Sequence, residues 1–189
     1  MFKLGVSSYS YSRLYKDGGF SLFDAVKHAK AVGFDVIEFS GLAGKKGDEL
    51  LGFAAEIKKA CDAAQIEVGN YTIGADLLNG SGGDLDKEIE RLKGEVDVAV
   101  VLGSKGMRHD AAWGYTDGRK TSRGFEDALP RLVKGCAAVT EYAASKGVVT
   151  MVENHGQFVQ DSERMEYLIN SVANPNFGAL LDKIGRAHV

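Results

Sequence analysis

The amino-acid sequence predicts an α/β protein in which helices connect the strands of a parallel sheet. Three observations favour this class: strand-like and helix-like segments alternate along the 189 residues, a helical pattern separates each strand from the next, and no linker interrupts the series. Helices between successive strands imply right-handed crossovers and therefore parallel neighbours. The β-α unit repeats about five and a half times, which corresponds to roughly six strands and five helices.

Two layouts fit this repeat, an open doubly wound sheet and a (β/α)8 barrel. No Gly-x-Gly-x-x-Gly follows the first strand, so a dinucleotide-binding open sheet lacks its best sequence sign. A complete (β/α)8 barrel usually needs about 250 residues. We therefore expect any barrel formed by this chain to be incomplete by two β/α units.

The strands are predicted from short apolar runs bounded by turn residues. Val148–Glu153 is the clearest, since apolar and β-branched residues precede the glutamate, and Lys105–His109 is the weakest. In chain order the predicted strands are Lys3–Ser8, Val36–Phe39, Ile66–Ile73, Lys105–His109, Val148–Glu153 and Phe177–Asp182.

The helices are predicted from apolar residues at helical spacing. The first begins at Ser21, which forms a capping box with Asp24, and ends at Gly33, a residue suited to the left-handed conformation of a helix stop. The others are predicted over Leu50–Ala64, Asp84–Leu102, Phe125–Ser145 and Ser162–Ala173.

The composition argues against several classes of protein. Hydrophobic residues make up 44% of the chain and charged residues 26%, and the formal net charge of −3 offers no basic excess for nucleic acid or an anionic membrane. No stretch approaches the roughly 20 apolar residues of a membrane span, and the N-terminus lacks the apolar core of a signal peptide. We expect a cytoplasmic protein without a nucleic-acid or membrane partner.

Two carboxylates follow apolar strands of the predicted sheet. In both layouts ligands bind at the carboxyl ends of the strands, where Glu153 and Asp182 lie. An ionised carboxylate after a buried strand is costly unless it is paired or bound to a cation, and two from neighbouring strands can share one hard divalent cation. We predict that Glu153 and Asp182 are metal ligands. The alternative for Glu153 is a salt bridge to a barrel Lys or Arg, or a helix cap.

Four further residues near strand ends are candidates for contacting a substrate. His155 can bind substrate or transfer a proton, or it can hold its loop through a hydrogen bond. Glu38 can orient a substrate or form a structural ion pair, and His109 can reach the same strand ends or belong to a surface loop. Tyr9, in the aromatic-serine run Ser7–Tyr11, can form a wall for a polyol or pack within its loop.

Four motifs resemble those of the xylose-isomerase-like TIM-barrel superfamily, which contains sugar phosphate isomerases/epimerases. They are Gly5-Val-Ser-Ser-Tyr-Ser-Tyr11, Gly33-Phe-Asp-Val-Ile-Glu38, Val152-Glu-Asn-His-Gly156 and Phe177-Gly-Ala-Leu-Leu-Asp182. The resemblance covers the chain as far as Asp182 and selects the barrel over the open sheet. It is specific for the superfamily but does not choose a substrate.

The resemblance implies roles for the candidate residues. Glu153 and Asp182 would bind Mn²⁺, Mg²⁺ or a similar ion and take part in proton removal and return next to a carbonyl, through a metal-stabilised enediolate. His155 matches a position that contacts substrate, and Glu38 matches a glutamate near the site. The implied activity is isomerisation or epimerisation of a small sugar or sugar phosphate.

The chain departs from the superfamily pattern after Asp182. The superfamily supplies a third metal ligand, a histidine, from strand seven and a fourth, a glutamate, from strand eight, and both strands are missing here. The final Ile-Gly-Arg-Ala-His-Val matches the translation of a widely used sequencing adapter. We therefore expect residues 1–183 to form a partial barrel, residues 184–189 to be a non-native tail, and the fragment as given to be inactive.

The resemblance leaves other functions open. An inosose-dehydratase-like lyase acting on a cyclic polyol would use the same two carboxylates. Endonuclease-IV-like cleavage would need more histidines at strand ends and a basic face. A barrel that only binds carbohydrate is the non-catalytic alternative. A homo-oligomer is compatible with all of these.

Overall fold

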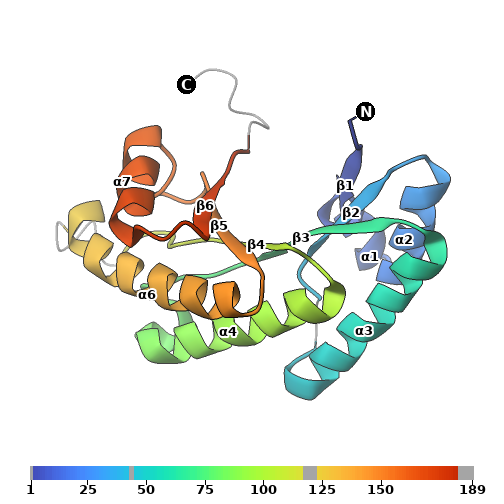
Figure 1. Cartoon of the computed structure of the whole chain (residues 1–189), viewed down its shortest axis with the longest axis horizontal. Helices are drawn as coiled ribbons and strands as arrows, with labels where there is room; N and C mark the ends of the chain where they lie inside the picture. The colour runs from blue at the N-terminus through green and yellow to red at the C-terminus, as the bar shows by residue number, and fades with distance from the viewer. Residues whose placement is uncertain (1, 43–44, 117–122, 183–189) are drawn as a thin grey trace. The chain divides into compact units, whose positions relative to one another are not determined.

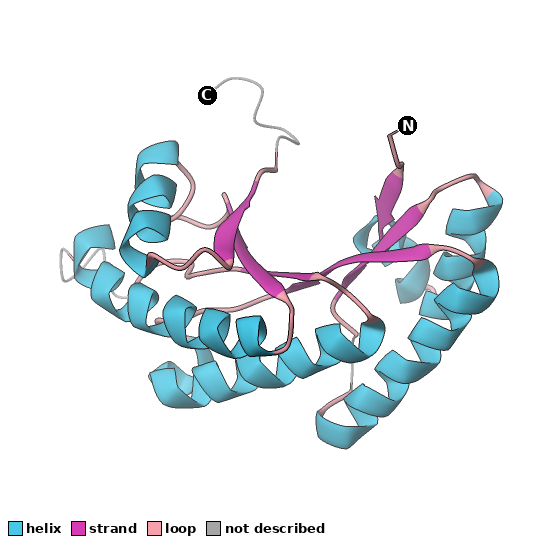
Figure 2. Cartoon of the chain, in the orientation of Figure 1, coloured by secondary structure: helices cyan, strands magenta, loops and turns pink. Residues whose placement is uncertain are grey.

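In the computed structural model, described for residues 2–42, 45–116 and 123–182, the chain forms six strands and six α-helices (Figures 1 and 2). The strands follow chain order in the sheet, β1-β2-β3-β4-β5-β6, and β1–β2, β2–β3 and β5–β6 pair in parallel. The predicted α/β class and partial (β/α)8 barrel are confirmed. None of the described helices is long and apolar enough to cross a membrane.

The structure divides into two compact units, which are described separately. One comprises Met1–Thr72 and Asp97–Met107, and the other Ile73–Val96 and Arg108–Val189. We refer to them as the first and the second unit. Helix α4 (Leu85–Leu102) and strand β4 (Gly106–His109) each contribute residues to both.

The first unit contains three parallel strands and the helices between them. Its strands are β1 (Gly5–Ser7), β2 (Val36–Ser40) and β3 (Glu67–Ile73), of which only Ile73 is assigned to the second unit, and its long helices are α2 (Leu22–Ala31) and α3 (Gly47–Ala64). The Ser21–Asp24 capping box predicted for the start of α2 is present. The fully buried core residues of this unit include Ile37, Phe39, Ala54, Ile57 and Cys61.

The helix that the sequence did not predict lies between β1 and α2. A 3₁₀ turn, η1 (Ser8–Tyr11), leads into the five-residue helix α1 (Ser12–Lys16). The Ser7 side chain accepts a hydrogen bond from Tyr9 N and caps this turn. No buried residue lies in α1, so the segment shows no apolar stripe from which a helix could be predicted.

The second unit places helices against the last strands of the sheet. Strand β5 (Val149–Glu153) pairs with β6 (Phe177–Leu180), and helices α6 (Phe125–Ser145) and α7 (Ser162–Val172) pack on them and on each other. The N-cap Asp161 of α7 accepts a hydrogen bond from Arg164 N. This unit also contains the turn η2 (Gly80–Gly83) and the first part of α4.

Strand β6 is shorter than the sequence predicted. The predicted strand reached Asp182, whereas the strand ends at Leu180, and Leu181 is 69% exposed. Among the described strands β6 pairs with β5 alone. A strand that is hydrogen-bonded on one side only is held less firmly at its end, which accounts for the difference.

Candidate functional site

The two faces of strand β5 have different surroundings. Thr150 Oγ1 lies 2.7 Å from Thr140 Oγ1 of α6, and both residues are buried, as is Val152. Since side chains alternate along a strand, Met151 and Glu153 point to the face opposite α6, and both are half-buried. Glu153 therefore lies on the face of β5 that α6 does not cover.

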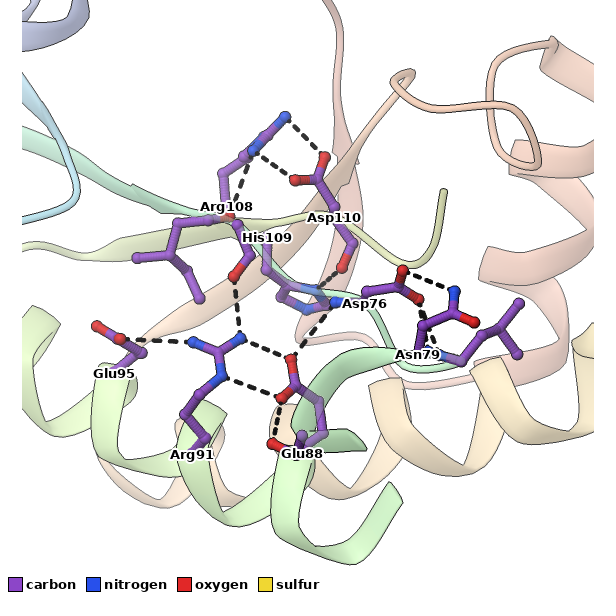
Figure 3. A network of polar contacts seen from close by, with 12 residues as sticks. Asp76, Asn79, Glu88, Arg91, Glu95, Arg108, His109 and Asp110 are labelled. Carbon is purple, nitrogen blue, oxygen red and sulfur yellow. Dashed lines mark hydrogen bonds and ion pairs between the residues drawn. The ribbon is translucent and has the colours of Figure 1, made fainter. Parts of the chain in front are cut away.

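Glu153 is paired with an arginine from the neighbouring strand. The carboxylate oxygen Oε2 of Glu153 forms an ion pair with Nη2 of Arg108, and the side chains are 15% and 8% exposed. The same Nη2 lies 3.0 Å from Oδ1 of Asp110 (Figure 3). One buried guanidinium therefore serves two carboxylates. The alternative that the sequence left open for Glu153, a salt bridge to a barrel arginine, is present.

His155 joins this group through Asp110. Its Nδ1 lies 2.9 Å from Asp110 Oδ1, and its side chain is 38% exposed. The ring of Trp113, a residue that is 50% exposed, meets the His155 ring edge-on with 4.6 Å between the centroids. We call Arg108, Asp110, Glu153 and His155 the Arg108 cluster.

Asp182 is attached to the end of β5 through Asn154. The side-chain amide of Asn154 donates to Asp182 O at 3.0 Å, and Asp182 N donates to Asn154 Oδ1 at 2.8 Å. In the β5–β6 ladder Glu153 lies opposite Leu180, two residues before Asp182. The structure thus places Glu153 and Asp182 at the same ends of neighbouring parallel strands, as the sequence predicted.

Gly156 allows the chain to turn directly after His155. Its φ is +79°, a conformation that side-chain-bearing residues rarely adopt. A Cβ at this position would lie 2.9 Å from the carbonyl oxygen of Ala112. The glycine of the Glu-Asn-His-Gly motif is therefore required where the loop after β5 meets the loop after β4.

His109 lies on the other side of β4 from Arg108 and Asp110. Its side chain is fully buried, its Nδ1 donates to Asp110 O at 2.8 Å, and its ring stacks on Phe177 with 6.4 Å between centroids. Nε2 is buried and has no hydrogen-bond partner among the described residues. The structure does not bring its side chain into the Arg108 cluster.

Burial lowers the pKa of His109 below its ordinary value of 6.5, and the hydrogen bond to the Asp110 carbonyl only partly opposes this effect. Below pH 6.5 the unfolded chain therefore takes up a proton that the folded chain does not. We predict that the free energy of unfolding falls as the pH decreases below 6.5, by up to about 1.4 kcal/mol per pH unit. Urea unfolding at several pH values measures it.

His109→Asn should flatten this pH dependence, since its amide can still donate to the Asp110 carbonyl, whereas His28→Asn, at an exposed position of α2, is the matched control and should keep it. If the free energy of unfolding of His109→Asn depended on pH as strongly as that of the unmodified protein, the assignment of this pH dependence to His109 would be contradicted.

A second polar network surrounds Glu88 on α4 (Figure 3). The Glu88 side chain is 3% exposed and accepts hydrogen bonds from Arg91 Nη2 at 2.6 Å and Ser81 Oγ at 2.7 Å. Burial acts to raise the pKa of Glu88, but these hydrogen bonds outweigh it and hold the pKa below its ordinary value of 4.5. Arg91 also donates to Gly74 O at 2.9 Å. The network fastens the loop after β3 to α4.

The remaining two predicted site residues belong to the first unit. Glu38 is a half-buried residue of β2 and lies opposite Ser7 of β1. Tyr9 is 71% exposed and borders a cavity of about 320 Å³. Aromatic rings and serine hydroxyls line much of this cavity, among them Tyr15, Phe20, Phe53, Ser12 and Ser40. Glu38 and Tyr9 belong to the first unit, whereas the residues of the Arg108 cluster belong to the second.

Arg108 and Asp110 are the residues of the Arg108 cluster that were not among the candidates of the sequence analysis, and Trp113, which contacts His155, was not among them either. Arg108 lies inside a predicted strand, and a long charged side chain in a strand is usually interpreted as a surface residue. The Arg-x-Asp spacing was the available signal, because residues two apart point to the same face of a strand.

A divalent cation fits the described residues only in part. Glu153 and Asp182 provide carboxylate oxygens, which are the ligands that Mn²⁺ and Mg²⁺ prefer. Across residues 2–42, 45–116 and 123–182, however, no three His, Cys, Asp or Glu side chains are grouped so that they could hold a metal ion. The Arg108 cation also neutralises part of the charge of Glu153.

The fold and this strand-end cluster define a (β/α)8-barrel protein whose polar site lies where ligands of such barrels bind. A family model described as xylose isomerase-like TIM barrel matches residues 26–183. The chain belongs to this family. No sequence among the curated proteins matches it.

Solved structures with the same fold include sugar epimerases and a dehydratase. A D-allulose 3-epimerase from Methylomonas sp., in complex with D-allulose, is 19% identical with a TM-score of 0.75, and the match covers 96% of this chain and 62% of that one. A 3-keto-D-glucoside 4-epimerase from E. coli is 16% identical with a TM-score of 0.74, and the match covers 100% of this chain and 72% of that one. A probable 3-DHS dehydratase from Bacillus anthracis is 17% identical with a TM-score of 0.70, and the match covers 96% of this chain and 63% of that one. The chain thus spans less than two thirds of the length of two of these proteins.

Proposed function

We propose that the protein is a divalent-metal-dependent isomerase or epimerase of a small sugar or sugar phosphate, acting in the cytoplasm. The observation that carries the proposal is the position of Glu153, a carboxylate at the carboxyl end of β5 beside Arg108 and near the half-exposed His155. Family membership and the epimerases among the structures with this fold support it.

In the proposed reaction Glu153 removes a proton from the carbon next to the substrate carbonyl and later returns one, and Asp182 assists from the neighbouring strand end. A bound Mn²⁺ or Mg²⁺ ion would supply stabilisation of the negative charge that develops on the substrate oxygens. Glu153 and Asp182 would hold that ion, together with ligands outside the described residues.

The other residues of the proposal bind and orient the substrate. His155 would accept or donate a hydrogen bond to a hydroxyl group, and Trp113 would limit access of water beside it. Glu38, Tyr9 and His109 are proposed as further substrate-binding residues. For His109, whose side chain is fully buried, the contribution would come through the Asp110 backbone that it holds.

Hydrogen exchange at the carbon next to the carbonyl tests the proposal. The product of the complete gene is incubated with D-allulose in D₂O, with Mn²⁺ or with EDTA, and followed by ¹H NMR. The expected result is Mn²⁺-dependent incorporation of deuterium and appearance of the C3 epimer. A dehydrated product would indicate the lyase instead, and binding of D-allulose without exchange would indicate a carbohydrate-binding barrel. If a panel of ketoses and their phosphates gives neither exchange nor epimer, the proposal is wrong.

A further inference from the structure

Arg108 anchors Asp110 in a buried position. Arg108 Nη2 lies 3.0 Å from Asp110 Oδ1, and Nη1 lies 3.4 Å from Oδ2. Nη1 also donates to the Ile73 carbonyl at 3.3 Å. Both side chains are less than one tenth exposed. With these contacts the Asp110 carboxylate has little freedom to turn.

The contact between Asp110 and His155 determines which ring nitrogen of His155 carries the hydrogen. A carboxylate oxygen only accepts hydrogen bonds, so Nδ1 must be the donor across the 2.9 Å separation. Arg108 Nη2 lies 3.4 Å from the same Nδ1, but a guanidinium only donates and cannot bond to a nitrogen that itself donates. The contact with Asp110 is the shorter of the two and therefore determines the tautomer. In the neutral ring Nδ1 carries the hydrogen and Nε2 has a free lone pair.

The charges around His155 determine which chemical group suits Nε2. Glu153 and Asp110 bring two negative charges to the cluster and Arg108 one positive charge. The cluster is therefore formally negative and disfavours a carboxylate or phosphate beside it. A neutral hydroxyl group, which can donate a hydrogen bond to Nε2, is compatible with this charge.

We propose that Asp110, anchored by Arg108, is a positioning residue that holds His155 in the Nδ1–H tautomer, so that Nε2 accepts a hydrogen bond from a substrate hydroxyl. The hydroxyl contact rests on the proposed function, whereas the tautomer does not. A carboxylate that orients a histidine ring in this way sets the tautomer available to the substrate.

The tautomer can be measured directly in the folded protein. Long-range ¹H–¹⁵N NMR of the protein labelled with ¹⁵N-histidine distinguishes the two neutral tautomers, and His155→Asn identifies the His155 signal by its loss. The expected result is a predominant Nδ1–H tautomer at neutral pH. A predominant Nε2–H tautomer in the unmodified protein would overturn the inference without any variant.

Asp110→Leu is the matching variant. Asparagine could keep its amide oxygen between Arg108 and Nδ1, whereas leucine offers Nδ1 no acceptor, so the Nδ1–H tautomer should fall from the major to the minor form, and KM for D-allulose should rise about tenfold through loss of one hydrogen bond, with a smaller change in kcat. Asp161→Asn, at the N-cap of α7 where asparagine also caps well, is the control and should change neither value. An unchanged His155 tautomer in Asp110→Leu would also overturn the inference.

The two proposals fail in different ways. A protein with the Nδ1–H tautomer but no exchange on any ketose retains the positioning role of Asp110 and refutes the proposed function. An active epimerase with the Nε2–H tautomer retains the proposed function and refutes the positioning role.

Discussion

Replacing Glu153 with glutamine is expected to lower the turnover of the proposed exchange reaction by about 10³-fold or more, because an amide cannot take up the proton that the carboxylate removes. Glutamine keeps the size of the side chain and can still accept a hydrogen bond from Arg108, so the fold should be preserved. Mn²⁺ binding should weaken as well, since a negatively charged ligand is lost. Deuterium exchange and calorimetric titration with Mn²⁺ measure the two effects.

Glu163→Gln is the matched control for Glu153→Gln. Glu163 lies in the first turn of α7 and is exposed, so its loss of charge should leave exchange and Mn²⁺ binding unchanged. Full activity in Glu153→Gln would refute the catalytic assignment of Glu153. If Mn²⁺ binding in that variant were also unchanged, the metal-ligand assignment would be refuted too.

Replacing Arg108 with methionine is expected to lower the free energy of unfolding by about 3–5 kcal/mol, because breaking a buried ion pair leaves an uncompensated charge. In this case two carboxylates, those of Asp110 and Glu153, lose their shared cation, and each is less than one fifth exposed. Methionine retains most of the apolar volume, so packing contributes little to the loss. Urea unfolding at pH 7 measures it.

Two further variants separate charge from packing in this prediction. Lys134→Met removes the cation of an exposed pair with Asp86 in the same unit and should cost less than about 1 kcal/mol. Adding Asp110→Asn and Glu153→Gln to Arg108→Met removes the stranded charges and should restore part of the stability. If Arg108→Met costs no more than Lys134→Met, the Arg108 cluster does not stabilise the fold.

The order and type of the long elements could be predicted from local patterns. Helix α6 has the predicted bounds, and α3, α4, α7 and all six strands lie within a few residues of their predicted positions. These elements have apolar residues at the period of their own secondary structure, and that period is a property of neighbouring residues in the chain. The prediction missed α1, which has no apolar stripe, and extended β6 too far, because an apolar run does not show that the strand is paired on one side only.

The strand-end position of Glu153, Asp182 and His155 also followed from the sequence, because polar residues after apolar strands of a parallel sheet gather at one edge. The sequence could not show that Arg108 reaches Glu153 or that Asp110 accepts a hydrogen bond from His155. Residues 108 and 153 lie on different strands, and their contact depends on how β4 and β5 face each other.

By itself, therefore, the sequence determined the α/β class, the family and the edge of the sheet where the polar residues lie. Only the tertiary structure decided that His109 is enclosed in the core while Arg108 and Asp110 face Glu153 and His155. The physical reason is that periodicity assigns a residue to a face of its own strand, whereas its charge partner depends on side chains that folding brings close from distant parts of the chain.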